Sequence, residues 1–123
     1  MLAVADNAFV APSVLIVDDH AEFRRRMRQL LEVEGYEVLG EAANGAAGLE
    51  AGRELNPDLV LLDVHLPDGL SFDLVPSLTD AAQVILISTH DEEAYRAKAH
   101  RCGASGFITK DELSGASIAE LLD

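Results

Sequence analysis

Two short segments read VLIVDD at residues 14–19 and LVLLD at residues 59–63. In each, an unbroken apolar run of β-branched residues and leucine leads directly into aspartate. A strand buried on one face alternates apolar with polar residues, whereas a strand covered on both faces is apolar throughout. We therefore predict two central strands of a sheet that is covered on both sides, and both strands end in carboxylates.

Three further segments complete the predicted sheet. Residues 84–87 repeat the unbroken apolar pattern, residues 106–109 are a shorter version, and residues 37–42 are more polar, which suits an edge strand. Segments with helical spacing of apolar residues separate these strands, and the predicted helices cover residues 21–34, 45–54, 71–77, 91–101 and 113–122. Strands that alternate with helices form a parallel sheet with helices on both faces, so the fold class is α/β.

Length, charge and cysteine content narrow the class of protein. The 123 residues suit one domain, predicted at residues 13–123 after an N-terminal extension at residues 1–12. No apolar run approaches the roughly 18 residues that indicate a membrane span, and a formal charge of −13 opposes direct binding to nucleic acid or anionic membranes. The single cysteine, Cys102, fits a reducing compartment. We expect a cytoplasmic protein.

Polar side chains follow the predicted strands at their carboxyl ends. In a parallel sheet, ligands bind outside these ends, where the strand order reverses. Taken one at a time, these residues have ordinary explanations as helix caps, turn residues or a surface lysine. Their joint placement favours a single site, and they are Asp18, Asp19, Asp63, Ser88, Thr89 and Lys110.

The three carboxylates of this group imply a bound cation. Converging carboxylates repel one another, and a shared cation keeps them ionised. A set of oxygen ligands suits Mg²⁺ or Mn²⁺. Asp63 then has one oxygen for the metal and one to act as a nucleophile, since carboxylates accept phosphoryl groups. Phosphoryl transfer depends on positioning and charge neutralisation, which the metal, Ser88 and Lys110 supply.

The segments together resemble the receiver domain of bacterial two-component response regulators. Asp18-Asp19-His20, with residues 40–45, is most similar to the NarL/LuxR-type subfamily, which usually carries a C-terminal helix-turn-helix. The resemblance implies a CheY-like, flavodoxin-like fold, with a five-stranded parallel sheet in the order 2-1-3-4-5. The matching parts are residues 14–20, 57–63, 84–89 and 103–110.

The resemblance implies roles for the acidic residues. Asp63 would accept a phosphoryl group from a phosphohistidine on a sensor histidine kinase. Asp18 and Asp19 would hold Mg²⁺, and the backbone carbonyl of His65 would join them. The protein would accept and hydrolyse its own phosphate without turning over an outside substrate, so it is not expected to be an enzyme.

The resemblance also implies a switch. Ser88 and Lys110 would close on the phosphate oxygens, and Phe107, at the aromatic switch position, would turn inward. The face formed by the last two helices would then change, as the surface for a partner or a homodimer. Thr89 stands where the family usually has a small residue and is expected to narrow access to the phosphate.

Two histidines are predicted to tune the lifetime of the phosphate. His65 and His90 lie two residues after Asp63 and Ser88, at positions that set phosphorylation and hydrolysis rates in the resembling family. A histidine there would order or block the attacking water; the alternative is an exposed polar side chain without a role. The loop at residues 64–70 is shorter than usual for the family, and the helix after it is short.

Other functions are weighed against this one. Phosphatases of the haloacid dehalogenase type carry an Asp-x-Asp motif after a strand. Here the position of the second aspartate is occupied by His65, and the chain has no room for a cap domain. Glycine-rich nucleotide-binding motifs are absent from the sequence. A receiver that only binds a partner stays open as an alternative, although the four intact charged site residues oppose it.

Two features bear on partners. The resemblance leaves open a stand-alone receiver and a receiver within a longer protein that carries a DNA-binding domain. Four arginines near the first aspartates are predicted to form a solvated helix face, with a kinase docking surface as the alternative; they are Arg24, Arg25, Arg26 and Arg28.

Overall fold

Five parallel strands form the central sheet of the computed structural model, which describes residues 11–122. Residues 1–10 of the predicted extension lie outside the described residues. The strand order is β2-β1-β3-β6-β7, which confirms the predicted order 2-1-3-4-5 when these strands are numbered along the chain. The strands are β1 (Ser13–Val17), β2 (Glu37–Ala42), β3 (Leu59–Asp63), β6 (Gln83–Ser88) and β7 (Gly106–Thr109).

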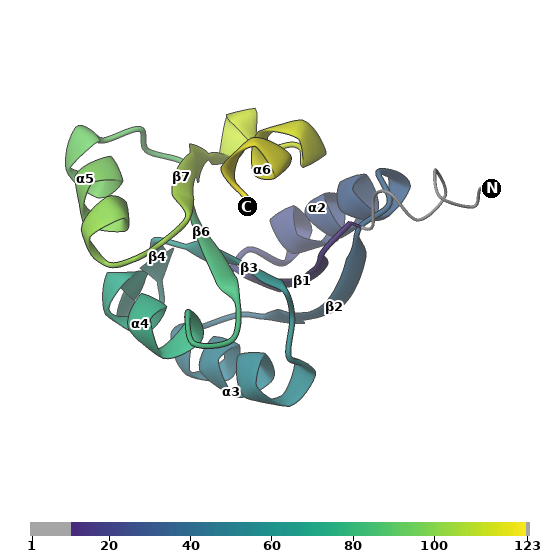
Figure 1. Cartoon of the computed structure of the whole chain (residues 1–123), viewed down its shortest axis with the longest axis horizontal. Coiled ribbons are helices and arrows are strands. Elements are labelled where there is room, and N and C mark those ends of the chain that lie inside the picture. Colours follow the sequence, from purple (N-terminus) through teal and green to yellow (C-terminus); the bar gives the residue numbers. More distant parts are fainter. Residues whose placement is uncertain (1–10, 123) are drawn as a thin grey trace.

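Helices cover both faces of this sheet (Figure 1). Alternate residues of each central strand point to opposite faces, so Leu15 and Val17 pack with α3, α4 and α5, while Val14 and Ile16 pack with α2 and α6. All four of these side chains are fully buried. The helices are α2 (Ala21–Val33), α3 (Gly45–Leu55), α4 (Val75–Leu78), α5 (Glu93–Arg101) and α6 (Gly115–Leu121). None of the described helices is long and apolar enough to cross a membrane.

A small antiparallel hairpin follows β3, which the sequence analysis did not predict. It pairs β4 (His65–Leu66) with β5 (Gly69–Leu70), and Pro67 and Asp68 form its turn. Gly69 has a φ of +124°, a conformation that side chains disfavour. The short loop after the third strand is therefore a defined hairpin.

The turn of this hairpin also caps a helix. Asp68 accepts hydrogen bonds from the backbone N–H groups of Gly45 (2.9 Å) and Ala46 (3.1 Å) at the start of α3. These two bonds hold the pKa of Asp68 below its usual range. The segment next to Asp63 is thus joined to a helix from an earlier part of the chain.

Two of the predicted helices differ from the structure. The predicted helix at residues 71–77 begins as a 3₁₀ turn, η1 (Ser71–Leu74), and α4 follows with Pro76 in its first turn. The predicted last helix is divided into η2 (Lys110–Glu112) and α6. Ser114 caps α6 through reciprocal hydrogen bonds with Ser117, which fixes its start.

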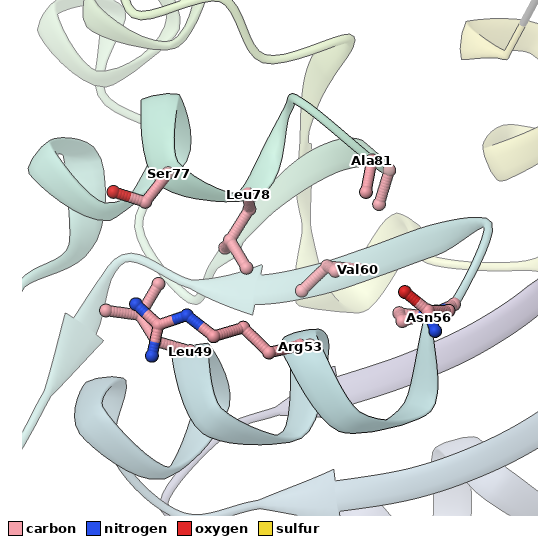
Figure 2. A pocket seen from close by; sticks show the side chains of 10 residues that line it. Leu49, Arg53, Asn56, Val60, Ser77, Leu78 and Ala81 are labelled. Carbon is pink, nitrogen blue, oxygen red and sulfur yellow. The ribbon is translucent and has the colours of Figure 1, made fainter.

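Two hollows lie at different places on the fold. One, of about 260 Å³, lies between α3 and α4 above Val60 near the start of β3, away from the carboxyl ends of the strands (Figure 2). The other, of about 700 Å³, is lined by residues of α2 and by Thr89, Lys110 and Leu113. The second hollow therefore borders the predicted site.

The packing of α3 on β1 gives a prediction about two glycines. A Cβ on Gly48 would lie 2.9 Å and 3.0 Å from the two methyl groups of the buried, stiff Val17. Helix propensity favours alanine by about 1 kcal/mol, but overpacking costs about 1–3 kcal/mol. Gly48→Ala should lower the free energy of unfolding by roughly 1 kcal/mol in urea denaturation.

The matched control is Gly52→Ala in the same helix. A Cβ there meets only the end of Leu78, at 3.0 Å, beside the hollow of Figure 2 into which that side chain can move. Gly52→Ala should be neutral or stabilising by up to about 1 kcal/mol. Equal effects of the two substitutions would contradict this account of the packing.

Candidate functional site

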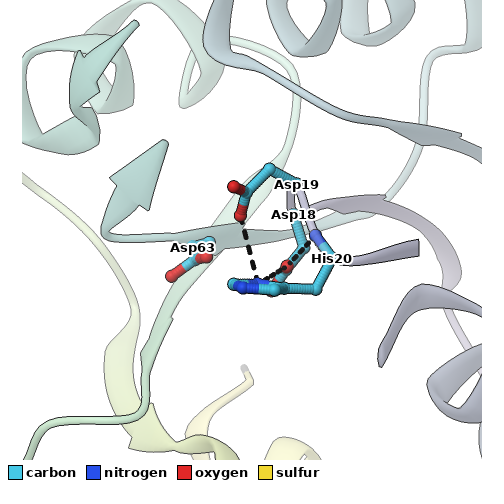
Figure 3. A group of neighbouring side chains, drawn as sticks. All are labelled: Asp18, Asp19, His20 and Asp63. Carbon is cyan, nitrogen blue, oxygen red and sulfur yellow. Dashed lines mark hydrogen bonds and ion pairs between the residues drawn. The ribbon is translucent and has the colours of Figure 1, made fainter. Parts of the chain in front are cut away.

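Carboxylates meet at the adjacent ends of β1 and β3. These strands are neighbours, with Val17 opposite Leu62, so Asp18 and Asp63 emerge side by side (Figure 3). The side chain of Asp18 is 0% exposed and that of Asp63 is 5% exposed. Asp19 is more open, at 34%. The sheet topology thus brings the predicted acidic residues together at the point where the strand order reverses.

Lys110 supplies a positive charge to this cluster. Its Nζ lies 2.5 Å from Oδ2 of Asp18 and 3.3 Å from Oδ2 of Asp63. The ring of Phe23 faces the same ammonium, 4.4 Å from the ring centroid. The lysine is therefore held between two carboxylates and an aromatic face rather than extended into solvent, and its side chain is only 10% exposed.

The charges of this cluster are not balanced. Burial and the neighbouring charge of Asp18 raise the pKa of Asp63 to about 6, against the opposing effect of the Lys110 ammonium. Of the described buried side-chain atoms, Oδ2 of Asp18 has no hydrogen-bond partner, because its contact with Lys110 is an ion pair without hydrogen-bond geometry. One lysine thus contacts two of the three carboxylates in the cluster, an arrangement that fits an additional cation.

The donor set fits a divalent cation with a preference for oxygen. Potential ligand atoms of Asp18, Asp19, His20 and Asp63 all lie within 4.8 Å of one another. Carboxylate oxygens suit Mg²⁺ and Mn²⁺, and Oδ2 of Asp18 has the Lys110 ammonium beside it but accepts no hydrogen bond. The residues present are therefore compatible with the predicted metal.

His20 also belongs to this cluster, although it was not among the predicted site residues. Its Nδ1 lies 3.1 Å from Oδ1 of both Asp18 and Asp19, and its backbone N–H donates to Oδ1 of Asp18 at 2.8 Å (Figure 3). Its position directly after the aspartate pair was the available signal. The imidazole bridges the two carboxylates on the exposed side of the site.

Two side chains outside the predicted site support its backbone. Arg24 donates to the carbonyl oxygen of Asp18 and also bonds Glu41. The buried hydroxyl of Ser71 donates to the carbonyl oxygen of Asp63 at 2.6 Å. Arg24 and Ser71 thereby fix the directions in which β1 and β3 end.

The arginine cluster is divided rather than uniformly solvated. Arg28 bonds Glu41 at 2.7 Å as well as the carbonyl oxygen of Val38. The bonds from Arg28 and Arg24 hold the pKa of Glu41 below its usual range. Arg26 is exposed and lines the hollow next to Lys110. The prediction of a solvated face is wrong for Arg24 and Arg28.

Ser88 ends β6, the strand next to β3, and Thr89 follows it. Asp63 pairs with Ile87, so Ser88 lies one residue beyond the acidic cluster. Ser88 is fully buried, and its Oγ accepts a hydrogen bond from the backbone N–H of His90 at 3.0 Å. Thr89 is exposed, with its Oγ1 3.2 Å from Nδ1 of His90. The serine is thus near the site but bound to its own turn.

Aromatic side chains enclose the side of the site opposite Lys110. Phe107 is 7% exposed, with the guanidinium of Arg96 4.9 Å from its ring centroid. Tyr95 of α5 lies between Phe107 and His65 and bonds Nε2 of His65 at 2.9 Å. Tyr95 did not stand out in the sequence, because only the fold brings α5 to the loop after β3.

The comparison with known proteins decides the family. The response regulator receiver domain matches residues 14–122. The chain belongs to this family. Its fold is similar to the signal receiver domain of the response regulator NarL from Mycobacterium tuberculosis, with a TM-score of 0.79 and 33% identity over 92% of this chain and 98% of that one. The NarL/LuxR-like relationship that the sequence predicted is confirmed.

Two further relatives show how widely this receiver domain is used. BvgA of Bordetella pertussis, a positive transcription regulator of virulence factors, is 39% identical over 80% of this chain and 49% of its own length. A CheX-CheY-BeF₃-Mg²⁺ complex from Borrelia burgdorferi has a TM-score of 0.79 and 26% identity, over 94% of this chain and 90% of that one. This receiver domain spans about half the length of the transcription regulators that it matches.

Family membership fixes the general function. Receiver domains are signalling domains of two-component systems and interact with sensor kinases, rather than turning over a substrate. The three-carboxylate cluster of this receiver domain is compatible with a divalent metal. The predicted class of function is thereby confirmed.

The raised pKa of Asp63 predicts a pH-dependent penalty on the metal-free protein. The folded pKa of about 6 exceeds the ordinary 3.8, so the folded state binds an extra proton between these values. The stability that this proton provides is fully present below pH 3.8 and is lost as pH rises through about 6. Asp63→Asn lacks the penalty, so its stability relative to wild type should rise by about 2–3 kcal/mol from pH 4 to 7.5.

Urea denaturation in EDTA at the two pH values measures this difference. Asp80→Asn is the control, because it removes the same charge from an exposed position. Its stability relative to wild type should not rise between the two pH values. Added Mg²⁺ should then stabilise wild type but not Asp63→Asn. A constant difference between Asp63→Asn and wild type across pH would contradict the penalty.

Proposed function

We propose that Asp63 accepts a phosphoryl group from the phosphohistidine of a sensor histidine kinase, in a reaction that depends on Mg²⁺ or Mn²⁺. The observation that carries this proposal is the pairing of Asp63 with Lys110 at 3.3 Å beside the buried, unsatisfied Asp18. A buried carboxylate with an adjacent ammonium is placed for transfer of an anionic group. The BeF₃ and Mg²⁺ in the complex of the similar CheY support an acceptor beside a divalent cation.

Each residue has a defined part in the transfer. A carboxylate oxygen of Asp63 forms a bond to phosphorus as the phosphorus–nitrogen bond of the phosphohistidine breaks, and the imidazole keeps the electron pair. The ammonium of Lys110 balances charge on the transferring group. Asp18 and Asp19, with the backbone carbonyl of His65, would hold the cation, and the cation would supply positive charge to the carboxylates and the transferring group.

Residues at the end of the neighbouring strand, β6, would then bind the phosphate. Ser88 would exchange its bond with the N–H of His90 for one to a phosphate oxygen, while Lys110 pairs with another. The loop after β6 would move, and the cluster of Phe107, Tyr95 and Arg96 would rearrange with it. The phosphate shifts a population between two forms rather than creating a new fold. Hydrolysis of the aspartyl phosphate resets the domain.

The hollow beside Lys110 is the docking place we infer for the kinase. It exposes apolar surface of Phe23 and Leu30 next to the site, with the charged Arg26 on its border. This hollow is lined by Lys110, which contacts Asp63, so a kinase bound there would lie next to the acceptor. Several of the matched relatives are transcription regulators, so we propose a transcriptional output for a longer protein of this kind. We also propose a homodimer through the face near α5 and α6.

Acetyl phosphate tests the acceptor directly. With Mg²⁺, wild type should gain one phosphoryl group by mass spectrometry, and Asp63→Asn should gain none. Lys110→Ala should label at least roughly tenfold more slowly, because a charge-assisted contact is lost. Labelling should be absent in EDTA.

The control for this labelling is Lys98→Ala, which removes a lysine from α5 where it lies over Phe72 and not over Asp63. Its labelling should equal that of wild type. A wild-type protein that takes no phosphoryl group from acetyl phosphate or from a kinase would favour a receiver that only binds a partner. Rapid multiple turnover of phosphate monoesters would instead indicate a phosphatase.

A second experiment distinguishes kinase docking from the chemical step. Arg26→Glu reverses a charge on the hollow and should raise the KM for phosphotransfer from a kinase roughly tenfold, with acetyl phosphate labelling unchanged. Arg53→Glu makes the same charge change on α3, across the sheet, and should leave both reactions unchanged. Equal loss in the two variants would show a general charge effect and contradict docking at this hollow.

A further inference from the structure

Tyr95 of α5 makes a contact to the loop after Asp63 that the proposed transfer does not use. Its hydroxyl and Nε2 of His65 are 2.9 Å apart, although the two residues are 30 positions apart in the chain. The rings meet edge to face, with centroids 5.4 Å apart. This hydrogen bond therefore fixes the orientation of a side chain two residues from the acceptor.

The ring of Tyr95 is itself held firmly. Phe72 lies against it at a centroid distance of 5.7 Å, and Phe107 at 6.4 Å. Both phenylalanines belong to the buried core. Tyr95 thus connects His65 to the packed interior, and the exposed imidazole does not have the rotational freedom of an ordinary surface histidine.

The backbone of His65 lies close to the acceptor. The backbone N–H of His65 is 3.4 Å from Oδ1 of Asp63, which places the residue at the rim of the carboxylate. His90 stands on the other side, with its ring 5.7 Å from that of His65 in an edge-to-face contact. His65 therefore borders Oδ1 of Asp63, whereas Lys110 contacts Oδ2, and His90 packs beside His65.

We propose that Tyr95 is a positioning residue that lengthens the lifetime of a phosphoryl group on Asp63 by holding His65 as a screen against water. This inference rests on the proposed function of Asp63. Nε2 is the nitrogen of His65 that reaches farthest from its backbone, and the tyrosine hydroxyl occupies it. In this orientation His65 blocks water and does not activate it.

The reaction that the screen retards is hydrolysis of the aspartyl phosphate. A bond forms from a water oxygen to phosphorus, and the bond from phosphorus to the Asp63 oxygen breaks. The electron pair returns to the carboxylate, and the water proton passes to solvent. Loss of the Tyr95 hydroxyl frees the His65 ring to move aside and leaves Nε2 open to bind water, and both changes raise the rate.

The test is the decay of the phosphorylated, Mg²⁺-loaded protein after removal of acetyl phosphate, followed by intact mass. Tyr95→Phe keeps the ring and its packing and should accelerate decay by roughly two- to tenfold, the equivalent of one neutral hydrogen bond. Tyr36→Phe also removes a tyrosine hydroxyl, one bonded to the carbonyl oxygen of Gly115, and should decay like wild type.

A double-mutant cycle shows whether Tyr95 acts through His65. In a His65→Ala background, Tyr95→Phe should have no further effect on the decay rate. A wild-type decay rate in Tyr95→Phe would overturn the inference, as would equal acceleration with and without His65. Labelling of every variant followed by unchanged decay refutes only the role of Tyr95, whereas no labelling of wild type refutes the acceptor and this inference together.

Discussion

The burial of two carboxylates beside one lysine is the constraint on which this receiver domain depends. Asp18 and Asp63 are almost inaccessible to solvent and compete for the single ammonium of Lys110. The raised pKa of Asp63 shows that the metal-free arrangement is electrostatically strained. A bound cation or a transferred phosphoryl group, as proposed above, would change this balance of charge.

The scaffold keeps this unfavourable arrangement in place. Parallel pairing of β1 with β3 brings the two aspartates to one edge, and the apolar residues before them are fully buried on both faces. Backbone bonds from Arg24 and Ser71 then fix the points where the strands end. The apolar residues of β1 and β3 stabilise the same strands that end in the two aspartates. Their burial therefore offsets the repulsion between the carboxylates at the sheet edge.

The sheet and the acidic cluster were predictable because short-range patterns encode them. Unbroken apolar runs indicated the central strands, and the aspartates that close them indicated the site. The hairpin after β3 was not predicted, although Pro67, Asp68 and Gly69 form a turn sequence. Its two strands are only two residues long, which is too short to give a pattern of alternating apolar residues. The bond from Tyr95 to His65 could not be predicted, since it depends on where α5 crosses the sheet edge.

The two sides of Asp63 therefore have different physical tasks. On the Lys110 side, the proposed transfer would depend on charge, and that side is built from residues that end or follow strands. On the His65 side, packing decides how water approaches, and that side is specified by aromatic rings from η1, α5 and β7. Charge can be retained while packing varies, so receiver domains with the same acceptor can keep their phosphate for different times.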